Sequence, residues 1–386
     1  MLKYFQNKIS LVDHFTVVSW FLILSFAFDF IDKIEIFYRI DFIKFNKYIK
    51  LVILIYALTF IIIHIKYLII HLKFVLYTYL VLSIILLIKI NHFETYFDEY
   101  IRYAFIFFLF PLLSFIFFQS KQNNLNYKLY ILLKYFIVLN SIAIILGMLL
   151  DIYVFKTYKG ERFGYNGFIL SQGITPYIYL FATAIFYSFR NYFMIFLTLI
   201  LAIISGVKGA YFAEFLFITL LVLSNNTLSK KYKAIIAIIL SLLFGFLIFA
   251  LLSLSPFKEL INSKGLLSAI FSLRSDNLLE LFNEITIKNF NVFVGATGIT
   301  PIRLELQIID VLLTFGAIGI VAFCYFYGMV FIKFIKENTS KAVFITAILL
   351  SLLSGNLFYI PLASLLFILT LFSLNENNNK RINNIL

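Results

Sequence analysis

Residues 234–255 read AIIAIILSLLFGFLIFALLSLS and contain no charged side chain. A helix needs about 20 apolar residues to cross the roughly 30 Å of hydrocarbon in a bilayer, so this stretch is long enough to span one. Backbone polar groups in lipid have to be paired within the segment, and a continuous apolar run achieves this as a helix. The stretch therefore predicts a transmembrane helix.

Apolar runs of the same kind follow one another along almost the whole chain. The 386 residues are 62% hydrophobic and 13% charged, whereas soluble domains average about 25% charged residues. The runs are continuous rather than alternating, which argues against an outer-membrane barrel. The sequence predicts an all-α integral membrane protein that forms a single polytopic membrane domain over residues 1–386. About twelve transmembrane helices are expected, near residues 15–31, 49–64, 72–90, 102–118, 130–150, 167–187, 192–206, 209–224, 234–255, 304–332, 342–355 and 358–374.

Basic residues in the short loops predict the orientation. With the N-terminus inside, clusters such as Lys230, Lys231 and Lys233 fall on the cytoplasmic side, where Lys and Arg are enriched. The basic residues at 33–50 would then be external, which counts against this orientation. We expect both termini to be cytoplasmic and residues 256–303 to form a large external, periplasmic loop.

The charge and the cysteine count exclude several classes of function. The net charge of +13 is spread over loops between spans, so it indicates membrane topology and not a nucleic-acid partner. Cys324 is the only cysteine, and the four histidines all lie in the first quarter of the chain. Neither a disulfide nor a metal or redox site is expected, and no cofactor is predicted.

Three polar segments meet on the predicted external side. They are residues 159–166 with Arg162, the turn 205–209 with Lys208, and the stretch that runs from Arg274 to Asp310. Each segment also has a plain explanation as a solvated loop or a helix hairpin. Together their cationic side chains suit an anionic ligand, because Arg grips phosphate oxygens in bidentate fashion.

Glu305 and Asp310 stand at the start of an apolar run, Val311 to Ile332, that contains no other charge. A carboxylate near the middle of a membrane costs about 2.5–3.5 kcal/mol, so it should face the bundle interior or a polar cavity. Thr300 and Pro301 predict a helix start, and on that helix Arg303 and Asp310 share a face. A buried Arg–Asp pair and a polar cavity open to the outside both fit this pattern. Glu214 is a further acid inside a span that is a candidate to line the same space.

The order of three motifs resembles the O-antigen polymerase family and the related O-antigen ligases. The motifs are Ser205–Ala210 (SGVKGA), Val292–Gly298 (VFVGATG) and Glu305–Gly319 (ELQIIDVLLTFGAIG). The resemblance covers roughly residues 155–375. The ligase pattern usually includes a His-Asn pair near the third motif, whereas this chain has no His beyond His92. Lys208 stands where an Arg is common.

This resemblance implies a GT-C-like glycosyltransferase of the bacterial inner membrane that works without metal or nucleotide sugar. It would join undecaprenyl-pyrophosphate-linked oligosaccharide repeat units at the periplasmic face, with membrane lipids and a chain-length regulator as further partners. The resemblance implies two groups of site residues. The catalytic group would contain Glu305, Asp310, Arg274 and Arg303, and one of its two acids would serve as the base. The substrate-binding group would contain Arg162, Lys208, Gly295 and Gly298.

Three other functions stay open on the sequence. An O-antigen ligase shares the architecture, and the absence of an external His is the main feature against it. A lipid-linked oligosaccharide flippase or transporter should show two related halves and a polar lumen spread over many helices. A scaffold without chemistry leaves the charges at 303–310 unexplained.

Overall fold

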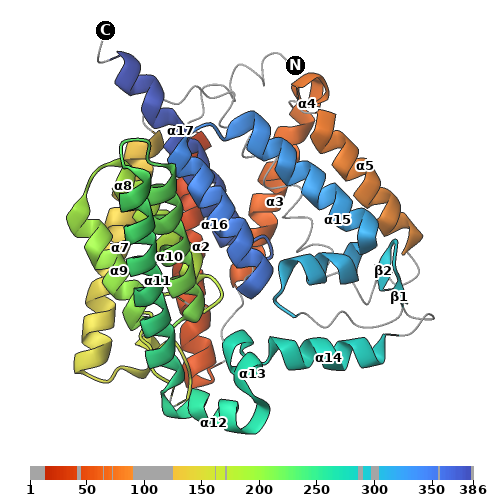
Figure 1. Cartoon of the computed structure of the whole chain (residues 1–386). Coiled ribbons are helices and arrows are strands. Elements are labelled where there is room, and N and C mark those ends of the chain that lie inside the picture. Colours follow the sequence, from red (N-terminus) through yellow and green to blue (C-terminus); the bar gives the residue numbers. More distant parts are fainter. Residues whose placement is uncertain are drawn as a thin grey trace.

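The fold is described from a computed structural model, which describes residues 14–40, 45–63, 65–71, 73–89, 125–160, 162–169, 172–285, 290–296, 304–354 and 357–383. Within these ranges the chain is almost entirely helical, as Figure 1 shows. The elements are α2 (His14–Tyr38), α3 (Phe45–Ile63), α4 (Ile65–His71), α5 (Lys73–Ile88), α7 (Leu125–Leu149), η2 (Tyr153–Phe155), α8 (Thr175–Ser188), α9 (Tyr192–Ile204), α10 (Lys208–Ser224), α11 (Lys230–Leu252), α12 (Ser255–Lys264), α13 (Leu266–Phe271), α14 (Arg274–Glu284), β1 (Phe290–Asn291), β2 (Gly295–Ala296), α15 (Gln307–Phe334), α16 (Asn338–Ser354) and α17 (Pro361–Asn383).

Three of the helices, α7, α11 and α15, are long and apolar enough to cross a membrane. Shorter apolar helices, among them α5, α9 and α16, accompany them. Large apolar side chains cover the outside of the bundle; Leu242 and Phe249 on α11 are 69% and 72% exposed. Such a surface is stable in contact with lipid and not with water. The predicted class of an all-α membrane protein is therefore confirmed, whereas the predicted span 102–118 lies outside the described residues.

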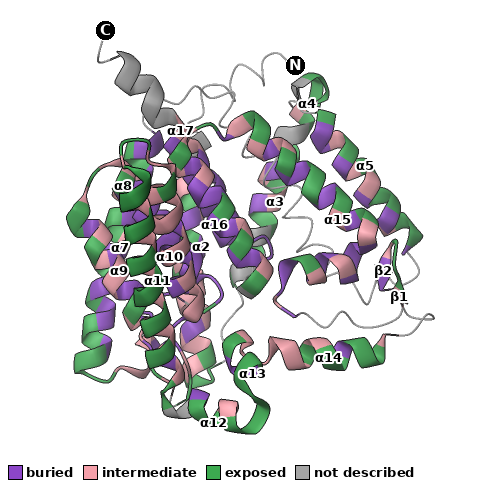
Figure 2. Ribbon diagram, in the orientation of Figure 1, coloured by how far each residue is buried: buried purple, intermediate pink, exposed green. Residues whose placement is uncertain are grey.

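Helix α8 forms the centre of the bundle. Every residue from Thr175 to Phe186 is buried, and α8 packs against α7, α9, α10, α16 and α17. Small residues such as Ala182 and Ala184 allow this close packing on several sides. Figure 2 shows the largely exposed surface of α11 at the front of the bundle beside the more deeply buried α16.

The structure corrects two of the predicted spans. The span predicted at 167–187 begins its helix at Thr175, and the described residues before it, 167–169 and 172–174, are not helical. The span predicted at 304–332 begins its helix at Gln307, because Leu304 to Leu306 are not helical and Glu305 has a φ of 58°. A continuous helix from Pro301 is therefore wrong, whereas Arg303, which was expected to share a face with Asp310, lies outside the described residues.

Helix α15 is broken at Gly316, where φ is 68° and ψ is −167°. The β1–β2 hairpin packs into this break: the N–H of Ala317 donates to the carbonyl of Val292 at 2.8 Å. A Cβ on Gly316 would overlap the backbone of Phe293, and one on Gly295 would overlap the carbonyl of Leu313. These glycines are thus required for the close approach of two backbones.

Two buried lysines pair with backbone carbonyls of the non-helical segments. Lys89 is 2% exposed and donates to the carbonyl of Thr314, next to the break in α15, at 2.6 Å. Lys33 is fully buried and donates to the carbonyl of Gly167, in the loop before α8, at 2.7 Å. Without such donors these carbonyls would stay unpaired in an apolar interior.

The predicted periplasmic loop, residues 256–303, contains α12, α13, α14 and the β1–β2 hairpin. Helices α12–α14 lie at one end of the bundle, and α14 runs across that end instead of along the bundle (Figure 1). This end also carries the loop before α8 and the turn between α9 and α10. The chain thereby gathers its polar segments on one side.

Replacing Gly316 by Ala should lower stability by about 1–3 kcal/mol, because the new Cβ meets the Phe293 backbone at a positive φ. The measurement is the thermal unfolding midpoint of the protein in a neutral detergent. Gly328→Ala is the matched control, since it lies on the same helix with open space around its Cβ position. Equal midpoints for the two variants would contradict this account of the break.

Candidate functional site

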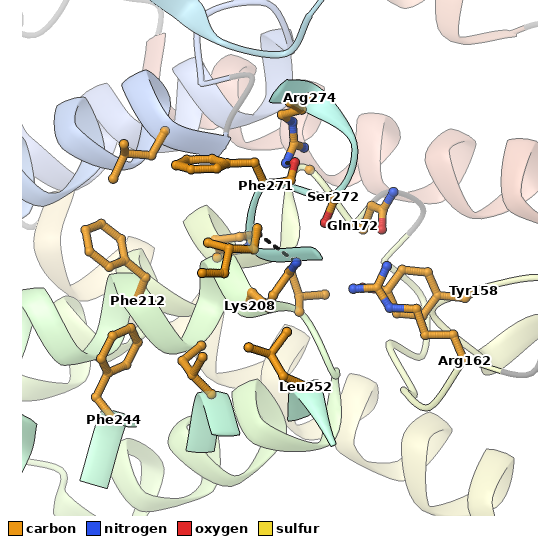
Figure 3. A pocket seen from close by; sticks show the side chains of 17 residues that line it. Tyr158, Arg162, Gln172, Lys208, Phe212, Phe244, Leu252, Phe271, Ser272 and Arg274 are labelled. Carbon is orange, nitrogen blue, oxygen red and sulfur yellow. Dashed lines mark hydrogen bonds between the residues drawn. The ribbon is translucent and has the colours of Figure 1, made fainter. Parts of the chain in front are cut away.

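A pocket of about 260 Å³ lies at the end of the bundle that α12–α14 cover. Its walls come from the loop before α8, from the first turns of α10, from the end of α11 and from the α13–α14 junction (Figure 3). Arg162, Lys208 and Arg274 contribute three cationic side chains to it. The opposite wall is apolar and is formed by Phe212, Phe244, Ile248, Leu252, Ile270 and Phe271.

The loop that carries Arg162 is joined to the turn that carries Lys208 through two glycines. A Cβ on Gly164 would overlap the carbonyl oxygen of Ser205, and a Cβ on Gly206 would overlap that of Phe163. The Thr157 hydroxyl donates to the Ser205 carbonyl at 2.8 Å, and the N–H of Tyr165 donates to Ile204 at 3.0 Å. The two segments are therefore held at backbone contact.

Lys208 is the first residue of α10 and reaches across to α13. Its Nζ donates to the carbonyl of Ala269 and, at 2.8 Å, to the carbonyl of Ile270. The ammonium also lies 4.6 Å from the centroid of the Phe257 ring. These contacts fix the position of the charge at the pocket wall.

Arg274 begins α14 directly after two left-handed residues, Ser272 (φ 52°) and Leu273 (φ 67°). This turn reverses the chain after α13 and directs the guanidinium into the pocket (Figure 3). Its Nη2 atom forms an ion pair with Glu305 Oε2 at 2.6 Å. The Arg274 side chain is 16% exposed and that of Glu305 is 39% exposed, so the pair lies at the edge of the protein.

Arg162 lies between two aromatic rings. Its guanidinium carbon is 3.9 Å from the centroid of Tyr158 and 4.3 Å from that of Phe257. Its Nε is buried without a hydrogen-bond partner among the residues that the structure describes. Burial lowers the pKa of Arg162, and the charge of Arg274 lowers that pKa further. The guanidinium is thus stabilised by the rings, and it lines the pocket without a carboxylate partner among the described residues.

The pocket carries an excess of positive charge. In the part of the chain that the structure describes, neither Arg162 nor Lys208 has a carboxylate within 4.0 Å, while Arg274 has Glu305. Burial lowers the pKa of Lys208, which precedes the predicted span 209–224, and the positive charges of Arg162 and Arg274 lower it further, to about 7. An anion in the pocket would relieve this repulsion.

The structure brings together four of the residues that the sequence singles out, namely Arg162, Lys208, Arg274 and, through its ion pair, Glu305. Gly295 packs against α15 and does not line the pocket. Arg303 and Gly298 lie outside the described residues.

The other two predicted acids have structural contacts away from the pocket lining. Asp310 accepts a hydrogen bond from the N–H of Leu304 at 3.0 Å and thereby holds the non-helical segment against α15. Glu214 is buried and accepts from the Thr183 hydroxyl at 2.9 Å. The expectation that Glu214 lines the same space is therefore wrong for this pocket.

Several residues of the site were missed by the sequence reasoning. Tyr158 and Phe257 stack on Arg162, and Phe212 and Phe244 form the apolar wall. Nothing in the pattern separates these rings from the other members of a set of 49 Phe and 25 Tyr. Only the packing of α11 and α12 against α10 shows which rings face the cations.

Binding of an anion to this pocket should weaken as the pH rises through about 7. Below that pH Lys208 in the empty pocket is charged; above it, one proton has to be taken up with the ligand, so the affinity falls by up to about tenfold per pH unit. The measurement is calorimetric titration with a short alkyl sulfate, whose charge is constant from pH 6 to 9, in a neutral detergent.

Lys208→Arg is the control for this pH dependence, because a guanidinium stays charged over the same range. Its affinity should therefore be flat between pH 6 and 9. Arg162 and Arg274, whose charges act on the lysine, are present in both proteins. An identical slope in the wild type and in this variant would assign the titration to another group.

The arrangement can hold a ligand with an anionic head and an apolar remainder. Three cations surround the head position, and the side chains of α10 and α11 provide the apolar surface beside it. Glu305 adds one carboxylate next to the cations.

The chain matches no protein-family model, no curated protein and no solved structure.

Proposed function

We propose that this chain is a polysaccharide polymerase that joins polyprenyl-pyrophosphate-linked oligosaccharide repeat units into a longer glycan. The observation that carries this proposal is the pocket itself, in which Arg162, Lys208 and Arg274 lie next to an apolar wall. A lipid pyrophosphate has the matching chemistry, since it combines a strongly anionic head with a hydrocarbon chain. A soluble nucleotide sugar would leave the apolar wall without a partner.

The membrane position of the pocket supports a lipid-linked substrate. Part of the apolar wall comes from α11, which is long enough to span a bilayer and is mostly exposed on its surface. A lipid chain can reach this wall from the side without leaving the hydrocarbon. The head group would then lie at the level of Arg274, at the end of the bundle.

The proposal includes a placement in the cell. The chain would be a GT-C-like enzyme of the bacterial inner membrane with about twelve spans, both termini cytoplasmic and the pocket at the periplasmic face. The basic cluster Lys230, Lys231 and Lys233 at the start of α11, at the other end of that helix from the pocket, supports this orientation. A chain-length regulator is the proposed protein partner.

In the proposed reaction a hydroxyl of the acceptor repeat unit attacks the anomeric carbon of the donor glycan. The new bond joins that oxygen to the anomeric carbon, and the bond between this carbon and the pyrophosphate oxygen breaks. Arg162, Lys208 and Arg274 stabilise the charge of the departing pyrophosphate. Glu305 accepts the hydroxyl proton, because it lies beside Arg274 and its side chain is partly exposed.

Arg162→Ala and Arg274→Ala should abolish polymer while the protein still inserts into the membrane, because each removes a cation from the pyrophosphate site. The measurement is a silver-stained lipopolysaccharide gel from a host strain in which the gene for this protein is deleted and replaced by the gene for the variant. The expected pattern is a core band with one repeat unit and no ladder. Arg190→Ala is the matched control, since Arg190 is exposed in the turn between α8 and α9, away from the pocket lining.

The same gel from the deletion strain distinguishes the alternatives. Polymer held on the lipid carrier, with no repeat unit on the core, would assign the chain as a ligase. Neither polymer nor repeat unit would assign it as a flippase. An unchanged ladder in that strain, or a full ladder in both arginine variants, would contradict the proposed polymerase.

Replacing Glu305 by Gln should reduce polymerisation by about 100-fold or more while the affinity for the anionic lipid donor is kept or increased, because the variant retains the shape and loses a negative charge beside Arg274 but cannot take the proton. Asp310→Asn should instead lower thermal stability, since it weakens the contact with the N–H of Leu304. The measurements are a polymerisation assay with purified protein and lipid-linked repeat units, and the unfolding midpoint. Normal turnover in Glu305→Gln would remove Glu305 as the base.

A further inference from the structure

Helix α14 has a continuous apolar face of which only part is covered. Leu278, Leu279, Leu281 and Phe282 lie on one side of the helix, opposite Asp276, Glu280 and Glu284, which are spaced by four residues. Leu281 is buried and, with Leu278, packs against a small cluster with Leu304, Leu306 and Leu313. Leu279 and Phe282 remain 64% and 62% exposed.

The neighbouring helix α13 shows the same property. Leu266 and Leu267 are 54% and 66% exposed, and Ile270 is 41% exposed, whereas Ser268 and Ala269 face the protein. Leu266 and Leu267 are thus turned outward, whereas Ile270 also lines the pocket. Contiguous apolar side chains at this level of exposure mark a surface that is covered in the working protein.

The covering material is indicated by the position of these helices. Leu252 ends α11, the membrane-capable helix with the most exposed surface, and α12 begins only three residues later at Ser255. Leu254, in the short link between α11 and α12, is also exposed. Helix α14 runs across the end of the bundle (Figure 1). The exposed apolar residues of α13 and α14 therefore lie at the end of the bundle that the chain enters directly from α11.

We propose that α12–α14 form a platform (Ser255–Glu284) that lies in the membrane interface, with Leu266, Leu267, Leu279 and Phe282 immersed in the lipid and with Glu280 and Glu284 of α14 in water, whereas Asp276 is held by Ser268 of α13. A helix with one apolar and one strongly charged face takes this position at a bilayer surface. The predicted periplasmic loop is then not a water-exposed domain over this part. The inference rests on the membrane class alone and is independent of the proposed polymerase.

The platform position has a consequence for the pocket. Arg274 stands at the α13–α14 junction, and the carbonyls of Ala269 and Ile270 hold Lys208. If the platform lies at the depth of the lipid head groups, these two cations lie there as well. The pocket is thereby held at the level where the phosphate of a membrane amphiphile is found.

The test uses the single native Trp, Trp20. In a Trp20→Phe background, Phe282→Trp places a fluorophore on the exposed apolar face of α14, and Glu280→Trp places the matched control on the acidic face of the same helix. Both proteins are reconstituted into phosphatidylcholine vesicles that contain brominated lipids. The fluorescence is then quenched either from the lipid or, with acrylamide, from the water.

We expect the brominated lipids to quench Phe282→Trp severalfold more than Glu280→Trp, and acrylamide to show the reverse order. The strongest quenching should come from bromines close to the head group. Leu279→Trp places the fluorophore at a second position on the same face. This variant replaces Phe282→Trp in the experiment if Phe282→Trp fails to insert into the membrane. Equal acrylamide access at both faces would overturn the proposal, and protection from both quenchers would assign the face to a protein partner instead.

Discussion

Backbone that leaves the helical conformation inside an apolar bundle has to find hydrogen-bond partners, and the architecture of this protein depends on how it does so. Lys89 pairs with Thr314 beside the break in α15, and Lys33 pairs with Gly167 in the loop before α8. Lys33 lies on α2 and Lys89 directly follows α5, so each bond also fixes the irregular backbone to another part of the bundle. The loop that Lys33 holds is the one that carries Arg162.

The pocket stabilises its three cations by different means. Arg274 has a carboxylate, Arg162 has two aromatic rings, and Lys208 has two carbonyls. Only the first of these partners cancels a full charge, so the remaining positive potential is available to a ligand. An effective dielectric constant well below that of water increases the strength of such an interaction. This combination favours an anion that is partly withdrawn from solvent.

The sequence predicts the membrane class and the residues of the cationic cluster, because continuous apolar runs and isolated charges are local features. It fails where one residue changes the backbone. Gly316 lies in the segment Phe315–Gly319, which reads as a normal apolar helix, and its positive φ arises from the β1–β2 hairpin that packs into it. The late start of α8 depends likewise on Asn140, which accepts from the N–H of Phe168 at 2.8 Å. Such long-range contacts leave no pattern near the residues they affect.

Lys208 reaches the pocket already immobilised. A lysine side chain that is free in solvent loses about 1.5–2 kcal/mol of rotamer entropy when it is fixed. The carbonyls of Ala269 and Ile270 and the ring of Phe257 impose this loss during folding. A ligand therefore meets an ammonium whose orientation is set, and the association does not include that entropic penalty.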